Sequence, residues 1–234
     1  MWSGERVVVI IPVLDEEETI GEVVANVDRE LVDRVIVVDN GSTDRTARAA
    51  REAGATVLYQ PRRGYGSACL TGIAAAQDAG ILVFLDGDGS DDPRELPTLL
   101  AALEPGIDLV VGSRTQGAAE PGALTPVQEL GNRLTCTLVR LFWGVRYTDL
   151  GPFRAVRRDA LARLELTDPD FGWTIEMQVK AAQRGLGIAE VPVACRVRRG
   201  GRSKVSGTVL GSYRAGTRIL GYVLEAKARD LLRL

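Results

Sequence analysis

Short runs of consecutive apolar residues, many of them β-branched, alternate with longer stretches of mixed polarity through the first half of the chain. Such runs, bounded by Gly, Asp or Pro, are typical of strands that are buried on both faces of a parallel sheet. The stretches between them have the composition and the start and stop signals of helices. This alternation predicts an α/β fold with a mostly parallel central sheet and right-handed crossovers. The expected strands are 6–11, 33–39, 56–59, 81–85 and 108–111.

The second half of the chain has a less regular pattern. A stretch rich in Gly and Pro at 116–126 predicts a surface loop. Further helices are expected at 127–143 and 172–184, and further strands at 147–156 and 188–197.

The end of the chain has the pattern of an amphipathic helix. Apolar residues recur at three-to-four spacing through 208–234, and basic residues occupy the other face. Such a helix either packs on the domain or lies at a membrane surface. We therefore expect one domain over 1–207 followed by a C-terminal amphipathic helix over 208–234.

Composition adds an asymmetry of charge. The net charge is only −2, but residues 1–110 hold 9 basic and 20 acidic side chains and residues 111–234 hold 20 and 11, so the halves carry −11 and +9. Acids in the first half can hold a metal, and bases in the second half can meet phosphates. The basic segment 196–204 has no interleaved aromatic residues, so nucleic-acid binding is not predicted.

Several classes of protein are excluded by residue counts. The chain has no His, which rules out His-based triads and His-ligated zinc. Its three cysteines, Cys69, Cys136 and Cys195, are widely spaced among small or apolar neighbours, as expected of buried thiols in a reducing compartment. No leader peptide and no apolar run of the roughly 20 residues that span a bilayer is apparent. We expect a soluble cytoplasmic protein.

The most informative stretch is 81–93, where a five-residue apolar run leads directly into four carboxylates. Asp86 and Asp88 are two positions apart, so an extended chain would direct both to one side, with Gly87 between them. Two hard oxygen ligands suit Mg²⁺ or Mn²⁺. The alternative is that the acids only cap the next helix, a role expected of Asp91 and Asp92.

Competing motifs fail at identifiable positions. The turn after the first strand, residues 12–15, lacks the glycines of a dinucleotide-binding loop and those with which nucleotidyltransferases hold a triphosphate. Residues 86–97 resemble a calcium loop, but Asp91 stands where Gly is needed and Pro97 where Glu is needed. What remains is an acid after the second strand, an acid pair after the fourth, and bases late in the sequence.

Four motifs in order, at 11–17, 38–44, 85–88 and 149–154, resemble those of the family 2 glycosyltransferases. The enzymes similar to dolichyl-phosphate mannose and glucose synthases are the best match. The resemblance covers about residues 7–207. It implies a single Rossmann-like domain of the GT-A type, a UDP-sugar or GDP-sugar donor, a divalent cation, and sugar transfer with inversion.

The resemblance also implies roles on the donor side. Asp88 would bind the metal, with Asp86 sharing it or holding the ribose, and Asn40 stands where the family often has a second Asp. The residues that would bind the nucleotide sugar are Pro12, Val13, Asp15, Glu16, Asp39, Arg63, Gly64, Asp86, Gly87, Arg202 and Lys204.

On the acceptor side, relatives that use lipid phosphates place an arginine where this chain has Arg114, and Arg133 is a weaker candidate. Asp149 and Glu176 are the candidate catalytic carboxylates, with Asp149 favoured for orienting the acceptor. A hydroxyl acceptor would need one of them as a general base, whereas an ionised phosphate would not.

Two other functions stay open: a nucleotidyltransferase-type enzyme acting on nucleotide sugars, and a non-catalytic nucleotide-sugar-binding module. The sequence leaves undecided the sugar, the base of the nucleotide, the acceptor and the oligomeric state.

Overall fold

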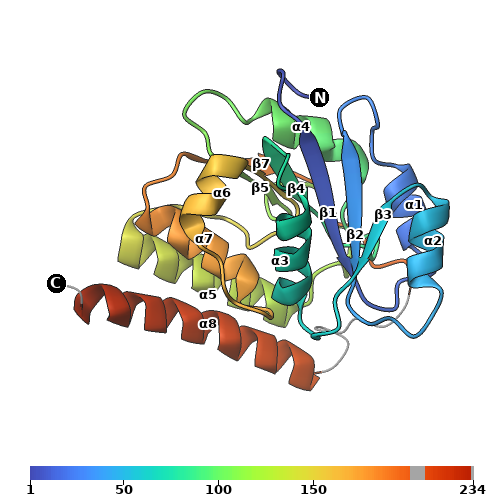
Figure 1. Cartoon of the computed structure of the whole chain (residues 1–234). Coiled ribbons are helices and arrows are strands. Elements are labelled where there is room, and N and C mark those ends of the chain that lie inside the picture. Colours follow the sequence, from blue (N-terminus) through green and yellow to red (C-terminus); the bar gives the residue numbers. More distant parts are fainter. Residues whose placement is uncertain (201–208, 233–234) are drawn as a thin grey trace.

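The fold is built on a seven-stranded sheet in the order β3-β2-β1-β4-β6-β5-β7 (Figure 1). The computed structural model describes residues 1–200 and 209–232. The strands are β1 Val7–Val13, β2 Arg34–Asp39, β3 Thr56–Tyr59, β4 Ile81–Phe84, β5 Leu109–Ser113, β6 Arg154–Arg157 and β7 Ile188–Pro192.

Strand pairing confirms the predicted mostly parallel sheet. β1 pairs in parallel with β2 and β4, β2 with β3, and β5 with β7. β6 is inserted between β4 and β5 and runs antiparallel to both. The carboxyl ends of β1, β2, β4 and β5 therefore meet at one edge of the sheet, where open α/β sheets bind their ligands.

Helices cover both faces of the sheet (Figure 1). A single 3₁₀ turn, η1 Pro93–Glu95, precedes α4. The helices are α1 Ile20–Ala25, α2 Thr46–Glu52, α3 Tyr65–Ala75, α4 Leu96–Ala101, α5 Pro126–Trp143, α6 Arg158–Leu164, α7 Trp173–Gln183 and α8 Val209–Leu232.

Alternation along the buried strands divides the core into two layers. Val8 and Ile10 of β1 belong to a cluster with side chains of α3, α5, α6, α7 and α8. Val7, Val9 and Ile11 belong to a second cluster with side chains of α1, α2 and α4. Because successive strand residues point to opposite faces, a fully apolar strand such as β1 holds both layers together.

The C-terminal helix α8 packs across α5 and α7 at one side of the molecule (Figure 1). Its buried residues Tyr222, Val223 and Ala226 join the core cluster of those helices. The indole nitrogen of Trp143 in α5 donates a hydrogen bond to Asp230 at 2.7 Å. This packing is the first of the two placements expected for an amphipathic helix here. Among the described residues, no helix is both long and apolar enough to cross a bilayer.

The second half differs from the predicted elements in three places. The strand expected at 147–156 begins only at Arg154, because residues 147–150 form a turn held by side-chain hydrogen bonds. The strand expected at 188–197 ends at Pro192, and helix α6 was not predicted. The three thiols are free and buried, as expected. The predicted domain boundary at 207 lies outside the described residues.

Candidate active site

A cavity of about 520 Å³ opens at the carboxyl ends of the parallel strands. This volume is in the usual range for small-ligand sites. Its walls include Pro12 and Val13 at the end of β1, the acidic loop after β4, and Arg114 after β5. The predicted donor and acceptor residues that line it are Pro12, Val13, Glu16, Arg63, Gly64, Asp86, Gly87, Asp88 and Arg114.

The two carboxylates of the acidic loop face this cavity together. Asp86 accepts a hydrogen bond from the Tyr65 hydroxyl at 3.0 Å, and Asp88 accepts one from the Ser90 amide at 3.0 Å. Burial raises the pKa of Asp86 to about 7, and the charge of Asp88 adds to the rise. A divalent cation would remove this repulsion, and carboxylate oxygens are the ligands that Mg²⁺ and Mn²⁺ prefer.

The protein supplies only part of a metal coordination shell. Within the described residues, no group of three or more Asp, Glu, Cys or His side chains could hold a metal ion. Asp86 and Asp88 would therefore share the cation with oxygens of a bound diphosphate, as Mg²⁺ sites commonly do.

Hydrogen bonds from neighbouring side chains fix the backbone of the acidic loop. The buried Asp91 accepts a hydrogen bond from the Asp86 amide at 3.2 Å, and the Thr19 hydroxyl donates to the Gly87 carbonyl at 2.8 Å. A Cβ on Gly87 would lie 2.5 Å from Val13, so only glycine fits there. The helix-capping role expected of Asp91 and Asp92 falls to Asp92 alone, which accepts from the Arg94 amide at 3.2 Å.

Asp39 and Asn40, at the end of β2, organise the neighbouring loop. Asp39 is buried and accepts a hydrogen bond from the Ser42 amide at 2.8 Å. The Asn40 side chain donates to the Gln60 and Arg62 carbonyls at 3.0 and 2.7 Å. Asn40 lines the cavity and Asp39 does not. An amide at position 40 can donate to these carbonyls, which a carboxylate cannot.

The loop that follows β3 brings Arg63 and Gly64 to the cavity wall. The Gly64 amide donates to Asn40 at 2.7 Å, and Arg63 donates to the Gly41 carbonyl at 2.8 Å. Gly64 has a φ of +139°, and a Cβ there would lie 2.2 Å from the Pro169 carbonyl oxygen. Asp15 lies behind the wall and accepts from the Thr43 amide at 2.7 Å.

Two arginines after β7 extend over the acidic side of the cavity. Arg198 forms an ion pair with Glu16 and lies 3.8 Å from Asp88, while Arg196 pairs with Asp92 at 2.5 Å. Both arginines line the cavity. Their individual roles were not predicted, although both fall in the basic segment that the sequence shows at 196–204. The predicted Arg202 and Lys204 lie outside the described residues.

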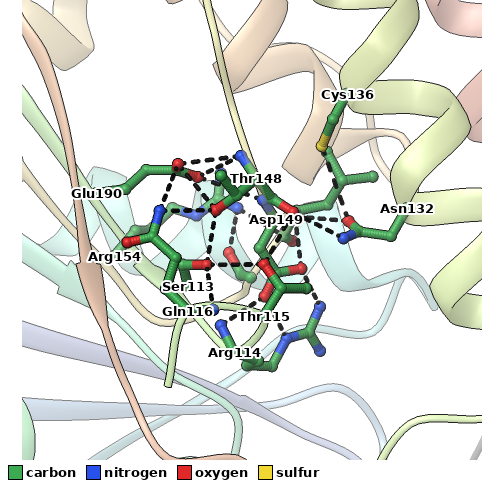
Figure 2. Close-up of polar contacts among 12 residues, drawn as sticks. Ser113, Arg114, Thr115, Gln116, Asn132, Cys136, Thr148, Asp149, Arg154 and Glu190 are labelled. Carbon is green, nitrogen blue, oxygen red and sulfur yellow. Dashed lines mark hydrogen bonds and ion pairs between the residues drawn. The ribbon is translucent and has the colours of Figure 1, made fainter.

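After β5, another part of the cavity lining is Arg114, which is held by Asp149 (Figure 2). The Nε and Nη2 atoms of Arg114 donate to the two carboxylate oxygens of Asp149, each at 2.8 Å, and the Arg114 amide donates at 2.8 Å as well. Burial lowers the pKa of Arg114, but the pairing with Asp149 outweighs it and raises the pKa above its usual value. Arg114 therefore presents a fixed positive charge to the cavity.

Asp149 does not line the cavity and has no exposed side-chain surface. Its carboxylate accepts the hydrogen bonds from Arg114 and another from the Leu150 amide at 2.8 Å. A carboxylate so occupied is a poor general base. Its geometry suits the orienting role favoured from the sequence, exerted through Arg114.

Glu176 and Arg133 are not brought to this site. Glu176 is buried in α7, accepts hydrogen bonds from the Thr167 and Asp168 amides at 3.0 and 2.7 Å, and pairs with Lys180 at 2.8 Å. Arg133 is exposed on α5. Neither lines the cavity, so neither is placed to act there as a base or as an acceptor ligand.

Part of the cavity wall is apolar. Leu124, Leu150, Phe171 and Ile219 contribute to it, and the exposed Asp170 adds one carboxylate. Ile219 belongs to α8, so the C-terminal helix forms part of the site. The cavity thus joins an acidic side with a basic and apolar side.

Comparison with known proteins identifies the family of this chain. The family model described as glycosyl transferase family 2 matches residues 8–164. The chain belongs to glycosyltransferase family 2. This confirms the resemblance and the GT-A fold that its motifs implied.

Relatives of this family 2 glycosyltransferase cover nearly its whole length. An uncharacterised glycosyltransferase of Mycobacterium tuberculosis is 40% identical over 211 residues, which are 90% of this chain and 94% of the relative. The undecaprenyl-phosphate mannosyltransferase of Micrococcus luteus is 31% identical over 220 residues, covering 88% and 90% of the two chains.

A solved structure extends the comparison to bound ligands. Glucosyl-3-phosphoglycerate synthase from Mycobacterium tuberculosis, in complex with Mn²⁺, UDP-glucose and phosphoglyceric acid, superposes with a TM-score of 0.80 at 28% identity. The match covers 97% of this chain and 81% of that one.

Proposed function

We propose that this glycosyltransferase moves a sugar, with inversion, from a UDP-sugar or GDP-sugar to the phosphate group of a lipid phosphate. One observation carries the proposal: a single cavity is lined both by the carboxylates of Asp86 and Asp88 and by the Asp149-held guanidinium of Arg114. The carboxylates suit a cation that carries the donor diphosphate, and the guanidinium suits an anionic acceptor.

On the donor side, Asp88 and Asp86 would hold Mn²⁺ or Mg²⁺, which when bound neutralises charge on the departing nucleoside diphosphate. Pro12, Val13, Arg63 and Gly64 would enclose the nucleoside, since they line the same wall. Asp39 and Asp15 would support that wall from behind through the 42–43 backbone.

Arg196 and Arg198, with the predicted Arg202 and Lys204, would supply positive charge to the diphosphate. Arg198 already lies between Glu16 and Asp88, so a donor bound there would meet a guanidinium at the acidic loop. Positive groups that meet the developing charge of a leaving group lower the barrier to its departure.

On the acceptor side, Arg114 would align a phosphate oxygen for attack on the anomeric carbon. A phosphate is already ionised at neutral pH, so no side chain has to remove a proton. This agrees with the placement of Asp149, which is occupied by Arg114, and of Glu176, which lies outside the cavity.

A second acceptor class is favoured by Asp170, an exposed carboxylate that lines the same cavity as Arg114. The solved relative binds phosphoglyceric acid, a small molecule with both a phosphate and a hydroxyl. For such an acceptor, Arg114 would hold the phosphate and Asp170 would accept the hydroxyl proton.

A lipid acceptor also calls for a surface that meets a membrane. We propose α5 for this role, at the cytoplasmic face, because Val127, Leu130, Leu134 and Leu141 are all exposed and lie on one side of the helix. The exposed Arg133 and Arg140 flank them, which suits anionic lipid headgroups. Gln128, in the first turn of the same helix, and Leu124, just before the helix, line the cavity.

Vesicle flotation tests this surface. The wild-type chain should float with vesicles of mixed phosphatidylglycerol and phosphatidylcholine, and Leu130→Ser with Leu134→Ser should reduce the bound fraction severalfold. Leu224→Ser, on the exposed face of α8, is the matched control. Equal binding by the wild type and the double variant would reject α5 as the contact.

Transfer assays test the function itself. UDP-glucose, UDP-galactose, GDP-mannose and GDP-glucose should be titrated calorimetrically with Mn²⁺, and the donor that binds should then be incubated with farnesyl phosphate or 3-phosphoglycerate. We expect one donor to bind only with metal and its sugar to appear on farnesyl phosphate. Transfer to 3-phosphoglycerate alone would select the second acceptor class. Absence of metal-dependent binding for every donor would contradict the proposal. Release of pyrophosphate from UTP or GTP incubated with a sugar 1-phosphate would instead indicate a nucleotidyltransferase.

A further inference from the structure

Glu190 of β7 holds the turn that carries Asp149 (Figure 2). The Thr148 amide donates to both Glu190 carboxylate oxygens, at 2.9 and 3.0 Å, and the Thr148 hydroxyl donates to Oε2 at 2.9 Å. The Asp149 amide donates to Oε1 at 3.3 Å. Gln116 donates to Oε2 at 3.2 Å and to the Thr148 hydroxyl oxygen at 3.0 Å. The carboxylate thus joins β7 to the backbone amides of Thr148 and Asp149.

The pairing of β5 with β7 connects this contact to Arg114. Glu190 pairs with Val111 in the parallel β5·β7 ladder, and β5 ends at Ser113, immediately before Arg114. Glu190 therefore sets the position of the Asp149 turn relative to the strand from which Arg114 projects. A shift of this turn would change the bidentate contact, because each of its two hydrogen bonds is 2.8 Å long.

A second support acts on the same turn from α5. Asn132 donates to the Thr148 carbonyl at 3.1 Å and accepts from the Leu150 amide at 2.9 Å. Asn132 fixes the turn against the helix, whereas Glu190 fixes it against the strands that end at the cavity.

We infer that Glu190 is a positioning residue for the acceptor site: it acts through the Thr148–Asp149 backbone to hold the Arg114 guanidinium in its cavity-facing orientation. The inference rests on the proposed function, in which Arg114 binds the acceptor phosphate. Glu190→Gln tests it, because the new amide nitrogen would face the Thr148 amide donor. Thr148→Val is a second variant that removes the hydroxyl contact while keeping the shape of the side chain.

The first measurement needs no substrate. In ¹⁵N-labelled protein, the Arg114 Nε–H resonance, assigned by its loss in Arg114→Lys, should be sharp and slow to exchange in the wild type because Asp149 accepts it. We expect both variants to speed its exchange at least tenfold while Tm changes little. Asp108→Asn is the matched control, since Asp108 accepts the Gly187 amide at 3.0 Å at the opposite end of the same two strands.

The second measurement uses farnesyl phosphate and the donor that binds. Glu190→Gln should raise the KM for farnesyl phosphate about tenfold and leave the donor KM unchanged, whereas Asp108→Asn should change neither. An unaltered Arg114 resonance in both variants would overturn the inference, whatever the kinetics. A perturbed resonance in a protein that transfers no sugar would support the positioning role and reject the proposed function, so the two failures are distinguishable.

Discussion

The two sides of the cavity hold their carboxylates in opposite ways. On the donor side, Asp86 and Asp88 face the cavity and repel one another, and burial helps to raise the pKa of Asp86 to about 7. On the acceptor side, Asp149 is wholly buried and accepts hydrogen bonds from Arg114 and from the backbone. At the donor side the two carboxylates are thus left to repel one another, while at the acceptor side the carboxylate of Asp149 holds the guanidinium of Arg114 in place.

This difference shows how one cavity can bind two anions. A diphosphate can approach Asp86 and Asp88 only with a cation between them, whereas a phosphate can approach Arg114 directly. Because the guanidinium is oriented before binding, little conformational entropy is lost when the acceptor arrives.

The largest effect is expected from Asp88→Asn. Loss of a metal-facing carboxylate should abolish detectable Mn²⁺-dependent donor binding and lower kcat/KM by about a thousandfold. Calorimetry with the donor, with and without Mn²⁺, measures the first effect. Asp78→Asn, which alters an exposed ion pair with Arg6 and Arg34, is the control and should behave as the wild type. If donor binding by Asp88→Asn still depended on Mn²⁺, the metal would not be bound by this loop.

A smaller and different effect is expected from Asp149→Asn. Breaking a buried pair costs about 2–5 kcal/mol, so acceptor kcat/KM should fall by about a hundredfold. Donor affinity should be unchanged, because Asp149 lies behind Arg114 and not on the donor wall. Parallel calorimetry and kinetics give both quantities. If Asp149→Asn and Asp88→Asn lost donor affinity equally, the assignment of Asp88 to the donor and Asp149 to the acceptor would be contradicted.

The acidic side should also make stability depend on pH. The pKa of Asp86 is raised from an unfolded value near 4 to about 7 in the folded chain, so the unfolded state loses its proton first. Without metal, Tm should therefore fall as pH rises from about 4 to 7, and Mn²⁺ should raise Tm more at pH 8 than at pH 6. Thermal scans of wild type and Asp86→Asn measure this, and the variant should show a flatter profile.

The smallest effect is expected from Tyr65→Phe. The Tyr65 hydroxyl donates to Asp86 at 3.0 Å, and a hydrogen bond to a charged group contributes about 1.5–3 kcal/mol. Because a bound metal would take over much of that role, we expect metal affinity to fall by less than tenfold. Titration of Mn²⁺ in the presence of UDP or GDP gives this value, and a hundredfold loss would make Tyr65 a principal determinant of the metal site.

The donor side could be predicted from the sequence because its key residues are adjacent in the chain. Asp86, Gly87 and Asp88 follow a buried strand, and parallel strand ends collect at one edge of a sheet. The family motifs then supplied the order of the other elements. The contribution of Tyr65 was not predicted, because it depends on α3 beginning at that residue.

The acceptor side could not be predicted in the same way. Arg114 and Asp149 are 35 positions apart, and Asp149 and Glu190 are 41 apart. Their meeting depends on β6 entering antiparallel between β4 and β5, which apolar periodicity does not show. The structural role of Glu176 was not predicted for a similar reason: its carboxylate accepts hydrogen bonds from a loop eight to nine residues earlier in the chain.

The central claim is that the cation belongs to the acidic loop and the phosphate to Arg114. Anomalous diffraction from crystals grown with Mn²⁺, UDP or GDP, and inorganic phosphate tests both placements at once. We expect one manganese peak between Asp88 and the diphosphate, with phosphate bound against Arg114. A manganese peak elsewhere, or phosphate bound only at the basic segment 196–200, would contradict it.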